Sequence, residues 1–579
     1  MDRAERRAAA AVVIAGILVG LWGIRWGLPG PARFRAFPER MAMTPETARR
    51  FTDSWKKMYE GIVSAHQGMR DEPDVEIKGV EEVPPGWDFP PDVLINSYRS
   101  LLIQSEHPDE KKSFIILSHM HPRRLDFKPL YVFYGGSFIY PLGLFLQIGA
   151  WLRTIVLVPG LEHYLQHPED MAGLYLCGRA FMLIFNVGTL WLLFDLGRRL
   201  SGPRTGVLAA LFFCLCPIAV VNSHIIKPHP YAAFWCLATA RWALIALETG
   251  ALRAYALSGL CCGMAGGANF SFACFAWLPV LAGFQRWRTG SAFAAELRGI
   301  LYAAAGAAGV FVVTNPYLVF SPRQFLWDFS LYVPHGGAGW SWSGLVSILG
   351  EASSASMGPL LYACALIGTA AALWRGAARR FLALAVAGTF AILWLAFGRV
   401  YSFGVSGIGI RYYYPLFPMA CVLAADWLES LSKRKLLAAA LACAALIDTG
   451  MRGLVYSANM SADSGPRSTR AAAADWIEAH VPPGASVGLP RYPAPPYTPR
   501  FRYNKYRLVV FQSPESLDPA RLPEYVVLDA EAQQTMASSL SARYGIAASF
   551  DPIRLGWGRA SDPGFFANTG VFVYRRKDS

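Results

Sequence analysis

Residues 178–200 read GRAFMLIFNVGTLWLLFDLGRRL, an apolar stretch that ends on two arginines. Its length is close to the roughly 20 residues that a helix needs to cross the hydrocarbon core of a bilayer. Blocks of this kind recur along the chain, and of its 579 residues 54% are hydrophobic and only 16% are charged. A soluble protein typically carries about a quarter charged residues. The sequence therefore predicts a mainly α-helical, polytopic membrane protein.

The basic residues indicate which loops face the cytoplasm. The formal net charge is +14, but these residues do not gather on one amphipathic face, which argues against a nucleic-acid partner. They form short runs between the apolar blocks, as cytoplasmic loops do. The runs are Arg198-Arg199 with Arg204, Arg253, Arg286 with Arg288, Arg375 with Arg379-Arg380, and Lys433-Arg434-Lys435. The expected helices are 178–197, 205–222, 231–248, 255–268, 270–285, 298–314, 357–374, 381–398, 411–428 and 436–455, with a break at Gly266-Gly267.

The chain changes side with each crossing, and this parity constrains one ambiguous segment. An uncleaved first helix, from Ala8 to about Leu28, starts inside, and the helix at 178–197 must enter from outside. The apolar segment 129–159 between them must therefore cross an even number of times, as a hairpin or a shallow re-entrant element. This parity gives about 11 crossings, or about 13 if the segment spans as a hairpin.

Two polar regions then face outward. The first, 29–128, belongs to a transmembrane domain over 1–455 and contains a helix that starts at Thr44 and Pro45. Its apolar face is expected either on the lipid headgroups or against the bundle. The second region, 456–579, is predicted to be a small α/β extracytoplasmic domain, with a helix at 471–479 and strands at 507–511, 525–529 and 570–574. All ten cysteines lie within or at the edge of apolar blocks, so the outward regions should fold without disulfides.

The tetrapeptide His107-Pro108-Asp109-Glu110 lies towards the end of the first outward region. Carboxylates there would lie at the water-facing mouth of the bundle, where a carboxylate can act as a base on a hydroxyl. The stretch from His107 through Pro129-Leu130-Tyr131 and Tyr134 resembles the first outward loop of GT-C class membrane glycosyltransferases. It is most similar to the family 39 and protein O-mannosyltransferase-like group. Further matches, which extend the resemblance to roughly 107–430, are Gly178-Arg179, Ser223-His224, Lys227-Pro228, Asn315-Pro316-Tyr317, and Arg411-Tyr412 with Pro415 and Pro418.

The resemblance implies transfer of a sugar from a polyprenyl-phosphate donor to an acceptor hydroxyl on the outer face, with inversion at the anomeric carbon. Asp109 occupies the family's position for the general base, and the adjacent Glu110 would orient the site. The cations for the donor phosphate would be Lys227 and Arg411, with secondary contributions from histidines. The remaining candidates are His224 and His229 for the phosphate, and His107, Tyr131 and His335 for a substrate loop. No cofactor is implied and no metal ligands are indicated, and the implied partners are the lipid bilayer, the lipid-linked donor and an acceptor.

Several alternatives remain open at the level of sequence. Asp109 and Glu110 could cap or solvate a loop, and Lys227 and Arg411 could anchor helix ends at the headgroups. The group commonly has an acid where this chain has His229, which keeps a catalytically inactive glycolipid-binding relative in view. A transporter is the alternative from another class. The expected location is a bacterial inner or plasma membrane, with the N-terminus cytoplasmic; the sugar and the acceptor (protein, lipid or glycan) stay unassigned.

Overall fold

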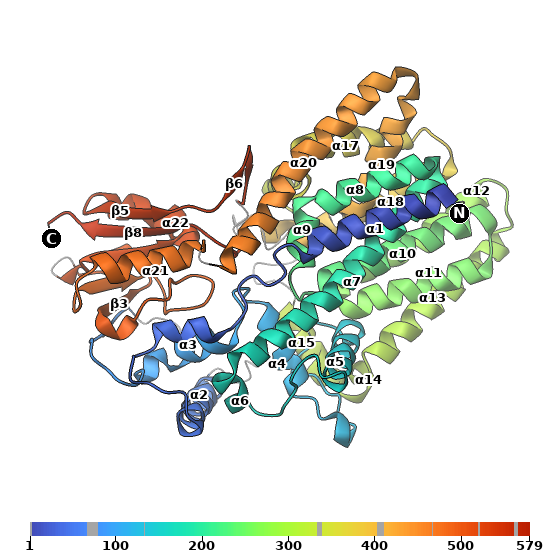
Figure 1. Cartoon of the computed structure of the whole chain (residues 1–579). Helices are drawn as coiled ribbons and strands as arrows, with labels where there is room; N and C mark the ends of the chain where they lie inside the picture. Colours follow the sequence, from blue (N-terminus) through green and yellow to red (C-terminus); the bar gives the residue numbers. More distant parts are fainter. Residues whose placement is uncertain are drawn as a thin grey trace.

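The chain forms a helical bundle with an α/β domain beside one end of it (Figure 1). The structure, a computed structural model, describes residues 3–65, 79–132, 134–332, 339–401, 410–465, 467–518, 521–560 and 565–578. The predicted fold class, a polytopic helical bundle with a small domain that contains a sheet, is confirmed. The bundle helices are α1 (Arg3–Leu21), α7 (Pro168–Ser201), α8 (Pro203–Leu215), α9 (Pro217–Ser223), α10 (Pro228–Thr249), α11 (Leu252–Ala268), α12 (Trp277–Arg288), α13 (Phe293–Thr314), α17 (Pro359–Ala372), α18 (Ala377–Phe397), α19 (Leu416–Ser430) and α20 (Lys435–Asp463).

Prolines set the starts of several of these helices. A proline fits the first turn because the N–H that it lacks would have no partner there, and because its φ is already helical. Pro168, Pro203, Pro217, Pro228 and Pro359 all stand at such starts. The helix expected at 205–222 is consequently two helices, α8 and α9, which meet at Cys216 with a bend of 65°.

Fewer helices are long enough to span a membrane than the sequence predicted. Among the described residues, five are long and apolar enough, or up to seven if two bent pairs count as spans, against the expected 11 to 13. The second bent pair is α16 (Trp342–Glu351) with its π-helical continuation to Met357, followed by α17 at 118°. The count is lower because α11, α17 and α19 have only 17, 14 and 15 residues.

The described residues of segment 129–159, which leave out residue 133, do not form a helical hairpin. The segment contains one helix, α5 (Gly136–Trp151) of 16 residues, and the short helix α6 (Leu161–Gln166) follows. A helix of this length spans about 24 Å, less than the roughly 30 Å of a bilayer core. It packs against α7 and α11 of the bundle.

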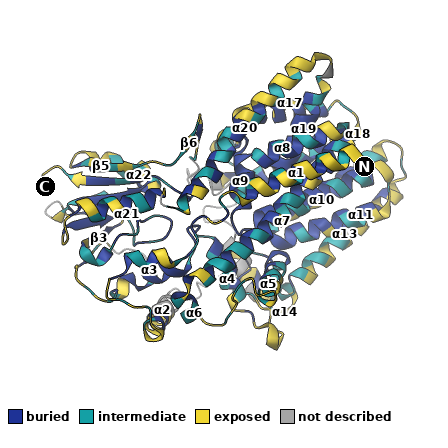
Figure 2. Cartoon of the chain, viewed as in Figure 1, coloured by how far each residue is buried: buried dark blue, intermediate teal, exposed yellow. Residues whose placement is uncertain are grey.

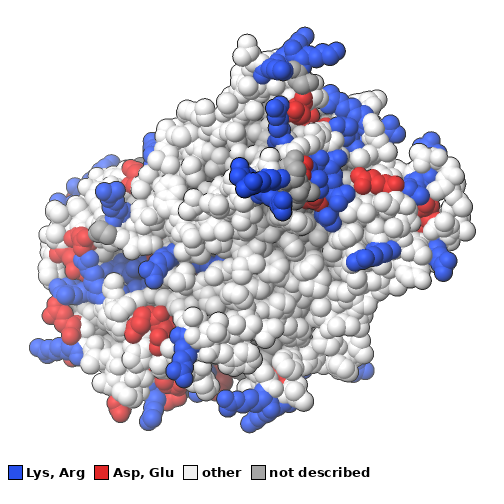
Figure 3. All heavy atoms as spheres, turned by 45° about the vertical axis from the view of Figure 1, so that its right-hand side comes forward, with Lys and Arg blue, Asp and Glu red and all other residues white. Residues whose placement is uncertain are grey.

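The exposed surface of the bundle is apolar, as contact with lipid requires. The apolar window of α13 is only 11% buried, and Figure 2 shows long exposed tracts on α13, α17 and α20. Figure 3 shows a wide uncharged area between the charged α/β domain and the basic residues at the other end of the bundle.

The α/β domain contains a six-stranded sheet that takes strands from both ends of the chain. Its order is β1-β3-β2-β4-β8-β5, with β1 (Val80–Val83) contributed by the first outward region and paired antiparallel to β3. The expected strands at 507–511 and 525–529 are β3 and β4. The other elements are α21 (Thr469–His480), β2 (Ser486–Leu489), α22 (Ala530–Ser541), β5 (Tyr544–Phe550), β6 (Arg554–Leu555), β7 (Gly558–Arg559) and β8 (Val571–Arg576). Helix α20 runs on to Asp463, past the expected boundary at residue 456.

The first outward region folds onto this domain and onto the end of α7. It contains η1 (Pro31–Ala36), α2 (Pro45–Ala65), β1, α3 (Asp92–Ile103) and α4 (Glu110–Ser118). Helix α2 starts as predicted, because Thr44 Oγ1 accepts a hydrogen bond from the Thr47 N–H at 3.2 Å. Phe51 of α2 is fully buried against Phe37 and Phe89. This part of its apolar face therefore packs on protein.

Candidate active site

Asp109 lies in the turn that starts α4, where the helix N-terminus favours a negative charge. The turn is held locally, because the Asp109 N–H donates to Nδ1 of His107 at 3.1 Å. A ring nitrogen that accepts a hydrogen bond carries no proton, so the His107 imidazole is neutral. Burial, the largest effect, and the charge of Lys227 keep the pKa of His107 well below its usual range.

Three cations from different parts of the chain surround the Asp109 carboxylate. Nζ of Lys227, the residue before α10, lies 2.7 Å from Oδ2, and Nη1 of Arg411, in η6 (Ile410–Tyr413) before α19, lies 3.5 Å from the same atom. Nζ of Lys112 lies 3.5 Å from Oδ1. The structure thus brings Asp109, Lys227 and Arg411 together. Lys112 was missed, although its spacing of three residues on a helix was a usable signal.

The cations keep Asp109 ionised. Burial raises the pKa of its carboxyl, but the charges of Lys227 and Lys112, with a smaller effect from Arg411, outweigh burial and hold that pKa well below its usual range. The Asp109 side chain is nevertheless 23% exposed, so the carboxylate can be reached from outside. The site is therefore an accessible anion within a cationic shell.

Glu110, next to Asp109, is fully buried. Its carboxylate is fully enclosed and accepts two hydrogen bonds from Arg179 of α7, at 2.9 and 2.7 Å. It also accepts the Ile226 N–H at 3.0 Å and the Ser105 hydroxyl at 2.6 Å. Glu110 therefore ties the start of α4 to α7 and to the residue preceding Lys227, which is a positioning contact.

A second buried ionic cluster lies just before the tetrapeptide. Glu106 is fully buried and forms ion pairs with Arg470 and Arg500 of the α/β domain. Arg470 also bonds both oxygens of Asp463 at 2.8 Å, and Arg33 lies 3.8 Å from Glu106. The segment with Asp109 is thus fixed on one side to the bundle and on the other to the α/β domain.

The two histidines predicted to bind the donor phosphate have different surroundings. His229, in the first turn of α10, is buried beside Tyr412, with ring centroids 5.9 Å apart, and its Nε2 is 3.4 Å from Nδ2 of Asn269. His224 instead bonds the Val220 carbonyl at 2.6 Å and lies beside Trp26, so the described contacts do not bring it to the carboxylate.

Two further candidates for the substrate loop remain. Tyr131 is buried and its hydroxyl lies 3.5 Å from the Lys112 carbonyl, so it contacts the backbone of α4. His335 lies outside the described residues. Within the described ranges, no three His, Cys, Asp or Glu side chains come together as ligands for a metal.

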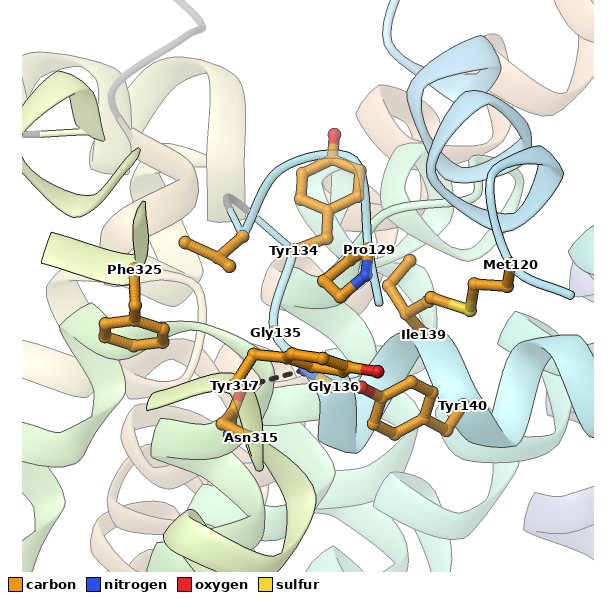
Figure 4. A pocket seen from close by; sticks show the side chains of 11 residues that line it. Met120, Pro129, Tyr134, Gly135, Gly136, Ile139, Tyr140, Asn315, Tyr317 and Phe325 are labelled. Atoms are coloured by element: carbon orange, nitrogen blue, oxygen red, sulfur yellow. Dashed lines mark hydrogen bonds between the residues drawn. The ribbon is translucent and has the colours of Figure 1, made fainter. Parts of the chain in front are cut away.

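A small cavity lies where two of the quoted motifs meet (Figure 4). Tyr134, just before α5, lines it together with Asn315, which caps the end of α13, and Tyr317, the first residue of α14 (Tyr317–Phe320), and its volume of about 10 Å³ is close to that of one water position. Oδ1 of Asn315 accepts the Gly136 N–H at 2.9 Å. A Cβ at Gly135 would clash with the Gly267 carbonyl, so glycine is required for this close approach.

No family model and no curated protein matches the chain. Several solved structures have a similar fold. One is the apo oligosaccharyltransferase of Archaeoglobus fulgidus, with 14% identity over 61% of this chain and 51% of that chain and a TM-score of 0.36. Another is ArnT from Cupriavidus metallidurans bound to undecaprenyl phosphate, with 12% identity over 80% of this chain and 93% of that chain and a TM-score of 0.43. A third is the arabinofuranosyltransferase AftD from Mycobacteria, with 15% identity over 83% of this chain and 40% of that chain and a TM-score of 0.36. The chain spans about half the length of the oligosaccharyltransferase, and at these scores the similarities assign no activity to it.

Proposed function

We propose that this protein transfers a sugar from a polyprenyl-phosphate donor to an acceptor hydroxyl, with inversion, and that Asp109 is the general base. One observation carries the proposal: an ionised, accessible carboxylate lies within 2.7 and 3.5 Å of Lys227 and Arg411. A base for the acceptor and cations for the leaving phosphate are the two things that this reaction needs. The bundle also has exposed apolar helices, such as α13, whose apolar window is only 11% buried, and these suit contact with the lipid tail of the donor.

In the proposed reaction the acceptor hydroxyl gives its proton to Asp109 as its oxygen attacks the anomeric carbon. The bond from that carbon to the phosphate oxygen breaks, and the electron pair leaves with the polyprenyl phosphate. Lys227 and Arg411 stabilise the charge that develops on this phosphate. Because attack comes from the face opposite the leaving group, the configuration at the anomeric carbon inverts. The phosphate is a stable anion, so no general acid is needed.

The same cations set the strength of the base. With Lys227 2.7 Å away, Asp109 is a poor proton acceptor because its pKa is held well below the usual range. A donor phosphate that binds Lys227 and Arg411 would share their charge and raise the pKa of Asp109. The carboxylate would then become an effective base only in the loaded site.

A transporter is the second candidate, because the pairs α8–α9 and α16–α17 are bent by 65° and 118° and broken helices are typical of transporters. The enzyme is favoured because the ionic site lies at helix ends rather than midway along them. Uptake by sealed vesicles containing the purified protein would separate the two functions.

The test of the enzyme is turnover in reconstituted membranes. The purified protein is incubated with polyprenyl lipids extracted from membranes, and release of free polyprenyl phosphate is followed by mass spectrometry. Asp109→Asn should lower the rate of release by at least about 100-fold, whereas Asp53→Asn, at an exposed acid of α2, should not change it. Full release by Asp109→Asn would remove the base from the mechanism.

A further inference from the structure

The β6–β7 hairpin is a small, separate feature of the α/β domain. Its two strands pair Arg554 with Arg559 and Leu555 with Gly558. The turn consists of Gly556 and Trp557, and Gly556 has a φ of +53°, as the first central residue of a tight hairpin turn requires. Because paired residues project to the same face of a hairpin, its two faces differ in composition.

One face of the hairpin is docked on the membrane-spanning helix α20. Gly558 lies so close to α20 that an added Cβ would clash with the Met451 carbonyl. At the tip, the Trp557 Nε1–H donates to Oδ1 of Asp448 at 3.1 Å, and Arg452 pairs with the same carboxylate at 2.8 Å. The position of the hairpin along α20 is therefore fixed.

The other face carries two arginines side by side. Like charges placed directly opposite each other destabilise a strand pair. Arg554 and Arg559 are both exposed, and within the described ranges neither side chain forms a hydrogen bond or ion pair. An anion between them would turn the repulsion into two charge-assisted interactions, because each guanidinium can bind a phosphate through two N–H groups.

Both arginines line a cleft of about 230 Å³ in the α/β domain. The acids of this cleft form no ion pair with the two arginines among the described contacts: Asp529 and Glu531 lie 3.7 and 3.6 Å from Arg491, and Asp551, which keeps its charge, accepts a hydrogen bond from Ser549. Within the described residues, the two guanidinium groups of the hairpin therefore have no acidic partner. Phe566, in its inner wall, also contacts His107, with ring centroids 5.4 Å apart.

The hairpin lies at the level where the apolar part of α20 ends. Ile447 is 56% exposed on that helix, and the hairpin contacts begin at the next residue, Asp448. The Trp557 indole is 54% exposed at the tip, and tryptophan is enriched where a membrane meets water. These features place the two arginines at headgroup height.

We propose that Arg554 and Arg559 form an anion site that binds the phosphate of a lipid headgroup in the leaflet next to the α/β domain. The site is separate from the cations around Asp109, and it does not depend on the proposed transferase reaction. The hairpin thereby gives the domain its own contact with the membrane.

The test uses the full-length protein in a neutral detergent, with short-chain phosphatidic acid as the probe and short-chain phosphatidylcholine and inorganic phosphate as comparisons. Arg554→Gln/Arg559→Gln should lose affinity for phosphatidic acid, by roughly tenfold for each arginine removed. Arg507→Gln/Arg521→Gln removes the same charge from exposed positions outside the cleft and should bind like the parent. The thermal midpoint of the first double variant should not fall, because it removes a repulsive pair.

Three results would overturn the proposal. The first is equal phosphatidic acid affinity in the two double variants, and the second is binding of inorganic phosphate or phosphatidylcholine as tight as that of phosphatidic acid. The third concerns the site at Asp109, tested in a Lys227→Met background. If the loss caused by the arginine substitutions disappears there, the lipid was bound at Asp109 and the hairpin is not its site.

Discussion

Glu106→Gln should loosen the segment that carries Asp109 without touching the site itself. In the native protein this buried carboxylate is paired with Arg470 and Arg500, and it lies three residues before Asp109. Removing its charge leaves the buried Arg470 with Asp463 as its remaining acid in the described cluster, and it takes from Arg500, which is 24% exposed, the acid with which it pairs. Breaking a buried ion pair from one side costs about 3–5 kcal/mol, because a charge is left uncompensated.

This cost should appear as local opening before it appears as global unfolding. The Glu106 N–H donates to the Gly27 carbonyl at 2.9 Å, and its hydrogen exchange therefore reports whether the segment is closed. At about 1.4 kcal/mol per tenfold, a loss of 3–5 kcal/mol speeds exchange through opening by roughly two to three and a half orders of magnitude. The measurement is hydrogen exchange with mass spectrometry on peptides that cover residues 100–112.

Glu82→Gln is the matched control, because Glu82 is exposed on β1 in the same outward region. It should leave exchange unchanged. Unchanged protection in Glu106→Gln, or an increase spread evenly over the bundle, would refute the reasoning that this cluster clamps the segment.

Three further predictions concern the site and its support. Lys227→Met removes a charge that lowers the pKa of Asp109. Because activity needs the ionised carboxylate and is lost as the pH falls through that pKa, the acidic limb of the kcat/KM profile should move to higher pH. An acidic limb at the same pH in the variant would contradict the pairing of Lys227 with Asp109. Asp109→Asn should lower turnover by about 10²–10⁴-fold while donor-lipid binding, followed by thermal shift, is kept; equal loss of binding would mean that the carboxylate is structural. Gly135→Ala should destabilise the packing of α5 on α11 by about 1–3 kcal/mol, measured by thermal unfolding. The control is Gly309→Ala, whose added methyl group meets open space, and equal thermal midpoints in the two variants would show that the backbone at Gly135 can move to accept the methyl group.

The sequence was informative where structure follows from local composition. Apolar length located α10, α13 and α18 within a few residues, because a helix that crosses a bilayer needs a long apolar run. Fewer helices pass the length test than the sequence predicted, because apolar composition alone does not reveal that α11, α17 and α19 are short. The break between α8 and α9 did have a local signal in Pro217.

Contacts between distant parts of the chain had no such signal. Residues 80–83, VEEV, are too short and too acidic to stand out as a strand, and β1 exists because β3 offers it an edge. Asp109, Lys227 and Arg411 could be named because each stands at a helix end within a recognisable motif. The partners of Glu106 could not, because Arg470 and Arg500 lie in ordinary sequence and meet Glu106 only when residues 29–128 pack on the α/β domain.

The position of β1 at the edge of the sheet has a practical consequence for anyone isolating the domain. Expressed from residue 467 onward, the domain would leave one side of β3 without a hydrogen-bonding neighbour, and bare strand edges recruit other molecules into aggregates. A soluble version should therefore carry residues 79–91 grafted through a linker. During biosynthesis β1 is made early, and it has no strand to pair with until β3 has been synthesised near the end of the chain.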